Sequence, residues 1–307
     1  IRDINLLSRD LYEDLKASKE FDFHYERKGL LMAYQTDKAG EAEWEVGERL
    51  IKAGLNAEML TKEEINKREP NANLDVKGGV YYDCDAHTTP SDFMPRMLEH
   101  LLNLGVEILA KEEVKNIEIS NKIISKIITD KREIIADEVV LAAGSWSPLL
   151  SKKLDLKLLI QAGKGYRINL ARETGITIPT ILLEAKVAVT PMNGFTRFAG
   201  TMEIGGINHD INPVRVNAIA KAGENFYKGL KVSKAEKNDA QCGLRPCSPD
   251  GLPFIGRSSK CTNLTVATGH AMMGWSLGPA TGKLVSEIIS EKKTSLDLNP
   301  FHPDRKF

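Results

Sequence analysis

The chain has 307 residues, 42 basic and 42 acidic side chains, and no formal net charge. That length fits about two domains, and 42% apolar with 27% charged residues is typical of a globular protein. Because no basic excess attracts a polyanion, the charge balance argues against nucleic-acid binding, and no apolar run is long enough to span a bilayer.

The first 19 residues predict a charged, amphipathic helix and not a signal peptide. Its apolar face carries Ile4, Leu7, Leu11 and Leu15. Two runs of alternating polarity follow and predict a hairpin, because each has the period of a strand. These runs are residues 21–25 and 29–34.

Two helices are predicted next. Residues 38–54 form the first, closed by Gly54. The second opens at a capping box from Thr61 to Glu64, and it must end before Pro70 because the residue ahead of a proline disfavours the helical conformation.

Residues 78–150 have an α/β texture. Residues 78–82 predict a strand, and Thr89 with Pro90 is typical of a helix cap and first position; Pro95 should kink that helix. Further strands are expected at 106–109, 114–119, 123–129, 133–136 and 139–144. Because the last one runs into a glycine turn, this region fits a mononucleotide-type sheet.

From about residue 160 the pattern becomes β-rich. A helix is expected over residues 215–230, and strands at 165–170, 186–190, 195–200 and 202–206. We interpret this as an antiparallel sheet covered by a helix, joined by the β-rich piece near residues 21–77. The sequence therefore predicts two interleaved domains.

The carboxy-terminal part carries the most specific pattern. It begins with GLRPCSPDGLPFIG from Gly243, followed by a strand at 264–267, a glycine-flanked loop at 269–278 and an amphipathic helix. Such a loop can direct free backbone N–H groups at an electron-rich ligand, although an ordinary strand–turn–helix has the same pattern. Arg245, expected in a turn-rich loop, favours the ligand-binding interpretation because its guanidinium matches a carboxylate bidentately.

This stretch resembles the signature of the FAD-dependent D-amino acid oxidase and dehydrogenase superfamily, which includes glycine and sarcosine oxidases. The pieces G-[LFM]-R-P, D-G-x-P-x-[IL]-G, A-x-G-H-x-x-x-G-[WFI] and P-A-[ST]-G occur in order and at family spacing. The resemblance implies an FAD-binding Rossmann-like domain interleaved with an antiparallel-sheet substrate domain. It implies a division into residues 1–20, 78–155 and 241–307 for FAD and 21–77 and 156–240 for substrate.

The resemblance also implies roles for single residues. Arg245 would bind the substrate carboxylate, with Met202 and Met272 lining the pocket, and no residue is expected to act as a dedicated catalytic base. The flavin would contact the loop whose amides and helix dipole favour negative charge on the reduced ring. The expected FAD contacts are Val114, Ala143, Gly144, Gly269, His270, Ala271, Met272, Met273, Gly274, Trp275 and Ser276. For His270 itself we favour a structural hydrogen bond over acid–base catalysis, and His87 is expected to be structural.

One family element is missing. Gly-x-Gly-x-x-Gly, which binds the pyrophosphate at a helix N-terminus, does not occur in the 307 residues. In the family this fingerprint precedes the segment equivalent to residues 1–19. We therefore expect the chain to correspond to the later part of a family member and to lack the amino-terminal βαβ unit of the FAD domain.

Departures from glycine oxidase favour the D-amino acid dehydrogenase branch. Val187 stands where that enzyme has a tyrosine, and Met272 where it has a second carboxylate-binding arginine. We expect oxidation of a D-amino acid, with D-proline or hydroxyproline among the candidates, by hydride transfer to flavin. An oxidase of glycine or sarcosine that uses O₂ is one alternative. A flavin-free fragment, or a subunit completed by another polypeptide, is the other.

The expected partners are a small D-amino acid and an electron acceptor, which the sequence leaves open between a quinone, a dye and O₂. Four cysteines without a CxxC pair indicate free thiols in a reducing compartment, so a cytoplasmic location is expected. Association with the inner face of the membrane and oligomerisation are left open. Because no HxH or HExxH pair occurs, no metal site is expected.

Overall fold

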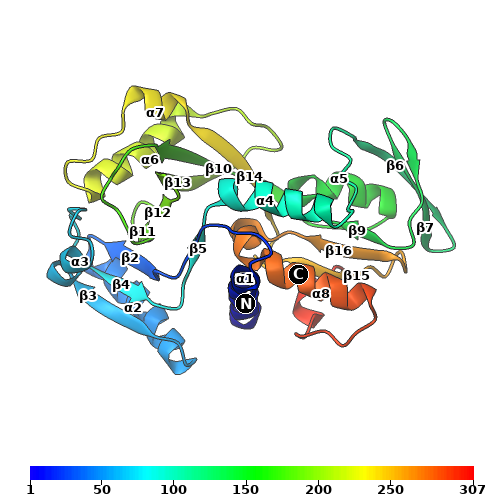
Figure 1. Cartoon of the computed structure of the whole chain (residues 1–307), viewed down its shortest axis with the longest axis horizontal. Helices are drawn as coiled ribbons and strands as arrows, with labels where there is room; N and C mark the ends of the chain where they lie inside the picture. Colours follow the sequence, from blue (N-terminus) through cyan, green and yellow to red (C-terminus); the bar gives the residue numbers. More distant parts are fainter.

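The computed structural model describes residues 1–307. Its elements divide between a large sheet on the left of Figure 1 and smaller sheets on the right, with α4 lying across the middle. The helices are α1 (Arg2–Ser18), α2 (Asp37–Lys52), α3 (Lys62–Arg68), α4 (Pro90–Asn103), α5 (Ser147–Ser151), α6 (Pro213–Phe226), α7 (Lys234–Asn238) and α8 (Gly274–Ile289), with 3₁₀ turns η1 (Gly144–Trp146), η2 (Lys152–Leu154), η3 (Ala271–Met273) and η4 (Asn299–Phe301).

The large sheet has eight strands in the order β14-β10-β13-β12-β11-β2-β4-β3. All neighbours are antiparallel except β11 and β2, which run parallel. Its strands are β2 (Leu30–Tyr34), β3 (Ala57–Thr61), β4 (Gly78–Tyr82), β10 (Gln161–Leu170), β11 (Thr180–Leu182), β12 (Val187–Met192), β13 (Phe195–Ile204) and β14 (Gln241–Cys247).

Helix α6 covers this sheet and closes a core of 24 buried residues. Alternate residues of β13 point inward, and Phe198 is fully buried. Gly223 of α6 lies against that ring, because a Cβ there would come within 2.8 Å of Phe198. The glycine therefore allows the helix and the sheet to approach closely.

The second part contains the sheet β15-β16-β9 and the antiparallel sheet β6-β7-β8. Strand β9 runs parallel to β16, with Leu141 opposite Val266. Ten buried residues form the core here, and β9 is the edge strand. The strands are β6 (Val114–Ser120), β7 (Ile123–Thr129), β8 (Glu133–Ile134), β9 (Val139–Leu141), β15 (Phe254–Arg257) and β16 (Leu264–Thr268).

Helices α1 and α8 lie side by side, although they come from opposite ends of the chain (Figure 1). Ile4 packs with Leu277 and Leu284 in one buried cluster, and the Ala280 amide donates to the Ser8 hydroxyl at 3.3 Å. The apolar face predicted for the first helix is thus covered mainly by the last one.

A short two-stranded ribbon, β1 (Tyr25–Glu26) with β5 (His87–Thr88), completes the fold. The indole N–H of Trp275 donates to the Thr88 hydroxyl at 2.7 Å. The ribbon is therefore fixed to the first turn of α8.

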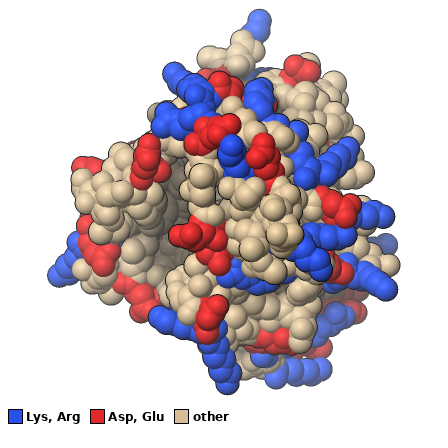
Figure 2. All heavy atoms as spheres, turned by 90° about the vertical axis from the view of Figure 1, so that its right-hand side faces the viewer, with Lys and Arg blue, Asp and Glu red and all other residues tan.

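Charged side chains of both signs are interspersed over the face in Figure 2, around a hollow lined by uncharged residues. No large area of one sign appears on that face, in agreement with the zero net charge.

Most expected elements are confirmed, including the Thr61 capping box, whose two hydrogen bonds are both present. Two expectations were wrong. Residues 21–25 and 29–34 form no hairpin, because β1 pairs with β5 and β2 pairs with β4 and β11. Residues 106–109 are not a strand, since no neighbour pairs with them. Thr89 is the cap residue of α4 and Pro90 follows it, as expected, although the Thr89 hydroxyl binds His24 instead of the helix.

The proposed division into domains stays a prediction. Strands β4 and β14 fall within the ranges assigned to the FAD-binding domain, whereas both pair within the eight-stranded sheet. Segments assigned by sequence to the FAD-binding domain therefore supply two strands of the large sheet.

Candidate functional site

Arg245 lies on β14, the edge strand of the large sheet, and not in the turn-rich loop expected from the sequence. It pairs with Gly163 of β10, while Gly165 pairs with Gly243. Its guanidinium lies across Gly165, where a Cβ would approach Nη1 to 2.1 Å. The absence of a side chain at that position gives the arginine room to lie over the sheet.

The Arg245 guanidinium has no acidic partner in the chain. Nη1 donates to the Thr201 carbonyl at 2.9 Å, and the side chain makes no ion pair. Burial lowers the pKa of Arg245, but a guanidinium stays charged in proteins. A half-buried cation with unused donors is suited to bind an external carboxylate.

Three groups surround Arg245 on the same edge. A Cβ on Gly163 would lie 2.8 Å from Cys247 Sγ and 3.4 Å from Met202 Sδ, so both side chains border this position. Thr201 has a φ of 63°, which is strained for a β-branched residue. That strain directs its carbonyl to Arg245. Met202 thus borders Gly163, the residue that pairs with Arg245, and its role in a substrate pocket stays a prediction.

The glycine-flanked loop reaches the same edge. Cys247 forms an isolated bridge with His270, which places the loop beside the end of β14. Gly269 has a φ of 78°, where other residues are strained, and Ala271 has a φ of 48°. Met272 is 68% exposed at the tip of this loop. A backbone held in such conformations occurs mainly where function requires it.

The amino terminus of α8 completes the loop. Met273 is its cap residue, and no side chain caps the helix, so the amides of Gly274, Trp275 and Ser276 keep the N-terminal partial positive charge. Tyr12 Oη donates to the Trp275 carbonyl at 2.9 Å. The hydrogen bond from Tyr12 therefore fixes the first turn of α8. The uncapped amides of the same turn remain suited to bind an anionic group.

His270 is held by α8. Its Nε2 is 2.9 Å from the Thr281 hydroxyl, so the hydrogen bond goes to a helix side chain and not to the backbone. Burial lowers the pKa of His270 to about 4, which keeps the imidazole neutral at pH 7. The residue ties the loop to the helix.

The turn after β9 lies beside β14 and next to the loop, because the Thr268 hydroxyl, directly before Gly269, donates to the Gly144 carbonyl at 3.3 Å. Ala143 precedes Gly144, whose φ is 52° and next to which a Cβ would meet open space. The Ser145 hydroxyl donates to the Leu244 carbonyl at 3.3 Å, and Trp146 is 43% exposed. This turn therefore borders the same region as Arg245.

Val114 is the one expected contact that lies elsewhere. It begins β6 in the separate antiparallel sheet at the right of Figure 1, whereas β14 lies near the middle. A common ligand would have to be long to reach both, as a dinucleotide is.

The sequence did not indicate a cavity of about 450 Å³ between α1, the β1–β5 ribbon and α8. Burial raises the pKa of Asp85 at its wall. Lining residues include Tyr12, Tyr25, Asp85, Met273, Trp275 and Ser276. Met273, Trp275 and Ser276 were already assigned to the loop, whereas Tyr12, Tyr25 and Asp85 lie far from it in sequence and gave no signal.

The model of the family of FAD-dependent oxidoreductases called DAO matches residues 1–288. The chain belongs to this DAO family. Its curated relatives include two named D-amino acid dehydrogenase. That of Helicobacter pylori (strain ATCC 700392 / 26695) is 30% identical over 93% of this chain and 68% of its own length. That of Rhizobium rhizogenes is 28% identical, over 94% of this chain and 70% of its own length.

Solved structures with a similar fold include two enzymes that act on amino acids according to their names. Glycine oxidase from Geobacillus kaustophilus superposes with a TM-score of 0.88 at 23% identity, covering 99% of this chain and 82% of that one. L-proline dehydrogenase from P. horikoshii gives 0.85 at 21% identity, covering 98% and 81%. The expected fold class, mixed helices and sheets with an antiparallel sheet, is confirmed at this level.

As a DAO member the chain is an FAD-dependent amino acid oxidoreductase. The residues present fit the flavin end of that cofactor: an uncapped helix terminus, a glycine with open space and two exposed apolar side chains. These are α8, Gly144, Trp146 and Met272. No diphosphate fingerprint occurs in the 307 residues, so we assign no residue to the diphosphate. None of the helices has both the length and the hydropathy to cross a membrane.

Proposed function

We propose that this DAO-family chain oxidises a D-amino acid as a dehydrogenase and that Arg245 binds the substrate carboxylate. The main support for this proposal is that the Arg245 guanidinium lies across Gly165 and bonds only to the Thr201 carbonyl, without an acidic partner. The names of the relatives from H. pylori and R. rhizogenes support the choice of D-amino acids and of a dehydrogenase.

The proposal gives the chain's residues a positioning role. With the carboxylate on Arg245, the α-carbon would lie between β14 and the loop after Gly269, since Cys247 and His270 join these elements. FAD, when bound, supplies the hydride acceptor. Met202, 40% exposed, and Met272 present apolar surface to the substrate side chain, which favours an amino acid with an apolar side chain or ring.

No side chain at this site is proposed as a proton acceptor. His270 is neutral and bonded to Thr281, and Arg245 cannot lose a proton in the working range. The substrate amine must then be neutral before oxidation. The main contribution of this chain to the reaction rate is then the orientation of the substrate by Arg245.

The test uses the FAD-reconstituted protein with an acceptor dye and a panel of D- and L-amino acids. Arg245→Met should raise KM by about 100-fold, because a charged hydrogen-bonded pair is lost. Arg167→Met is the matched control. Arg167 lies on the neighbouring strand β10 and binds Gln241, and its loss should leave KM unchanged.

Either of two outcomes would overturn the substrate assignment. One is an unchanged KM in Arg245→Met with unchanged folding, and the other is a preference for L-amino acids in the unmodified protein. Release of peroxide at the turnover rate, without a dye, would replace the dehydrogenase by a glycine- or sarcosine-type oxidase.

A second experiment would identify the electron acceptor. Quinone reduction in the presence of lipid vesicles, with co-sedimentation of the protein, would support association with the membrane surface. Reduction of the dye alone would leave the protein with a diffusible acceptor.

The open edge of β9 favours a second candidate function. Val140 is 40% exposed on this edge strand, which pairs with no further strand. We propose that a strand from polypeptide outside these 307 residues pairs here and that this chain alone is the substrate-binding part. A purified, folded chain without the visible absorbance of flavin after incubation with FAD would support it, and full flavin binding would overturn it.

A further inference from the structure

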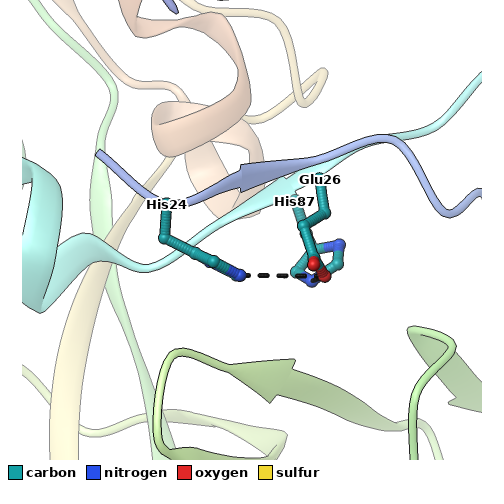
Figure 3. A group of neighbouring side chains, drawn as sticks. All are labelled: His24, Glu26 and His87. Carbon is teal, nitrogen blue, oxygen red and sulfur yellow. Dashed lines mark ion pairs between the residues drawn. The ribbon is translucent and has the colours of Figure 1, made fainter. Parts of the chain in front are cut away.

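Three metal-ligating side chains meet on one face of the β1–β5 ribbon. His24 and Glu26 are two residues apart at β1, so they point to the same side of the strand. Glu26 pairs directly with His87 across the ribbon. Figure 3 shows all three side chains on the same side of the two strands, with His24 directed at Glu26 and His87.

The ligating atoms are close enough for one small cation. His24 Nε2 lies 3.7 Å and His87 Nε2 3.5 Å from Glu26 Oε2, and all three ligand atoms lie within 4.8 Å of one another. Two ligands of a tetrahedral zinc ion, each about 2.0–2.1 Å from it, are roughly 3.4 Å apart. Small rotations of the imidazoles would close the remaining difference.

His87 lacks any other partner. Its side chain is only 8% exposed, and neither ring nitrogen makes a hydrogen bond. A buried polar group without a partner costs free energy, and such groups are rare in folded proteins. A bound cation would remove this cost at Nε2.

His24 is already oriented for coordination. Its Nδ1 lies 2.9 Å from the Thr89 hydroxyl, which also accepts from the Asn193 amide at 2.9 Å. Metal-binding histidines commonly donate their second ring N–H to such a neighbour, and this fixes the ring and its tautomer. With the proton on Nδ1 and donated to Thr89, the Nε2 lone pair of His24 faces Glu26.

We propose that His24, Glu26 and His87 form a site for one divalent transition-metal ion of the zinc type, with the fourth position open. Two imidazoles and one carboxylate are a donor set that zinc accepts. The HxH and HExxH search could not find this site, because its third ligand arrives by strand pairing from β5.

Without metal, Lys28 occupies part of this position. Its Nζ lies 2.9 Å from Glu26 Oε2, and the lysine side chain is 43% exposed. A bound cation would repel the ammonium, which is free to move into solvent. Lys28 therefore weakens the site, and its removal should strengthen binding.

The site would stiffen the ribbon next to the flavin-contacting loop. His87 is followed by Thr88, which receives the Trp275 indole hydrogen bond. A metal that joins β1 to β5 would therefore fix the position of Thr88, whose hydroxyl accepts the hydrogen bond from Trp275 in the first turn of α8.

Zinc alone is the probe, added to metal-stripped full chain and measured by competition with a chromogenic chelator. We expect one zinc ion per chain. Glu26→Gln and His87→Gln should each weaken binding by 100-fold or more, and Thr89→Val by about 10-fold, as for lost neighbours of metal ligands. Lys28→Gln should tighten binding by about 10-fold, since a like charge is removed.

His100→Gln is the matched control, because His100 forms a two-residue pair with Glu20 at 3.1 Å but has no third ligand. It should bind zinc as the unaltered chain does. Co²⁺ in place of Zn²⁺ should give visible bands without the thiolate charge-transfer absorption that the free cysteines would produce.

Three results would overturn the proposal. They are absence of stoichiometric zinc binding, unchanged binding in Glu26→Gln, and thiolate absorption in the Co²⁺ form. Glu26 is 37% exposed at its side chain, so Glu26→Gln keeps the test valid if His87→Gln fails to fold.

Discussion

The eight-stranded sheet and the three-stranded sheet β15-β16-β9 differ in how completely this chain covers them. The larger sheet has 24 buried core residues and the helix α6 above it. The smaller one has 10, and its edge strand β9 leaves Val140 40% exposed. Arg245 lies on the larger sheet, whereas the loop after Gly269 extends from the smaller sheet, whose edge strand β9 has no further partner.

This difference separates two ways of positioning a site. Arg245 is held by strand pairing and by the space above Gly165, which change little without ligand. The loop is held by a few separate contacts: the hydrogen bonds between His270 and Thr281, from Trp275 to Thr88 and from Tyr12 to the Trp275 carbonyl, and the bridge between Cys247 and His270. The position of Arg245 should therefore change little without ligand, and the loop after Gly269 should be more easily perturbed.

The largest expected effect comes from the larger core. Phe198→Ala should lower the free energy of unfolding by about 3–5 kcal/mol, because a fully buried ring leaves a cavity. Leu264→Ala, in the central strand β16, should cost about 2 kcal/mol, since a smaller core can collapse further. Urea unfolding measures both values.

Hydrogen exchange on the same variants sharpens the comparison. Phe198→Ala should reduce protection in β10, β12 and β13 and leave that of β16 unchanged. Equal loss of protection in both sheets would mean that they unfold as one unit, contrary to the comparison drawn here.

Gly165→Ala should have the next largest effect. Its Cβ would lie 2.1 Å from Arg245 Nη1, so the guanidinium must move. We expect kcat/KM for a D-amino acid to fall by about 100-fold, which equals roughly 2.7 kcal/mol.

Gly243→Ala is the control, because Gly243 pairs with Gly165 but a Cβ there meets nothing within 4 Å. Equal losses in the two variants would show that the strand itself, and not the position of Arg245, determines activity.

A third prediction concerns pH. The pKa of His270 is lowered to about 4 in the folded chain from about 6.5 unfolded, so between these values the unfolded state binds more protons. Stability contributed by the neutral imidazole is present above pH 6.5 and is lost as the pH falls toward 4, by about 2 kcal/mol at pH 5.

His270→Gln keeps a hydrogen-bond partner for Thr281 but does not titrate. Its unfolding free energy, measured from pH 4 to 8, should therefore fall less steeply than that of the unaltered chain. If the unfolding free energies of the two proteins fell in parallel with pH, the loss of stability could not be assigned to His270.

The smallest effect is expected at the open edge. Val140→Lys should change the unfolding free energy by less than about 0.5 kcal/mol, because the side chain is half-exposed. It should reduce concentration-dependent self-association, since a lysine on an edge strand opposes pairing with another chain. Unchanged sedimentation at high concentration would show that this edge is not a point of association.

Local signals predicted much of the fold from the sequence. The helix α1 follows from its apolar periodicity, and α3 follows from the Thr61 capping box, because both signals act within a few residues. The pairing of Glu26 with His87 could not be predicted, since it joins strands of two residues each across a long stretch of chain.

The candidate site shows the same limit. The motif around Arg245 predicted a carboxylate-binding arginine, but its turn residues suggested a loop, while pairing with β10 makes it a strand. Strand formation there is a tertiary effect that overrides local preference. The roles of the residues expected to contact FAD stay predictions, including that of Val114 in a different sheet.

The packing of α1 on α8 has a consequence during synthesis on the ribosome. Helix α1 ends at Ser18 and α8 begins at Gly274, so at about 5–20 residues per second the first helix waits roughly 15–50 s for its partner. Until then the apolar face of Ile4 stays open to other surfaces. The order of synthesis therefore leaves the amino-terminal helix without its main packing surface until nearly the whole chain has been made.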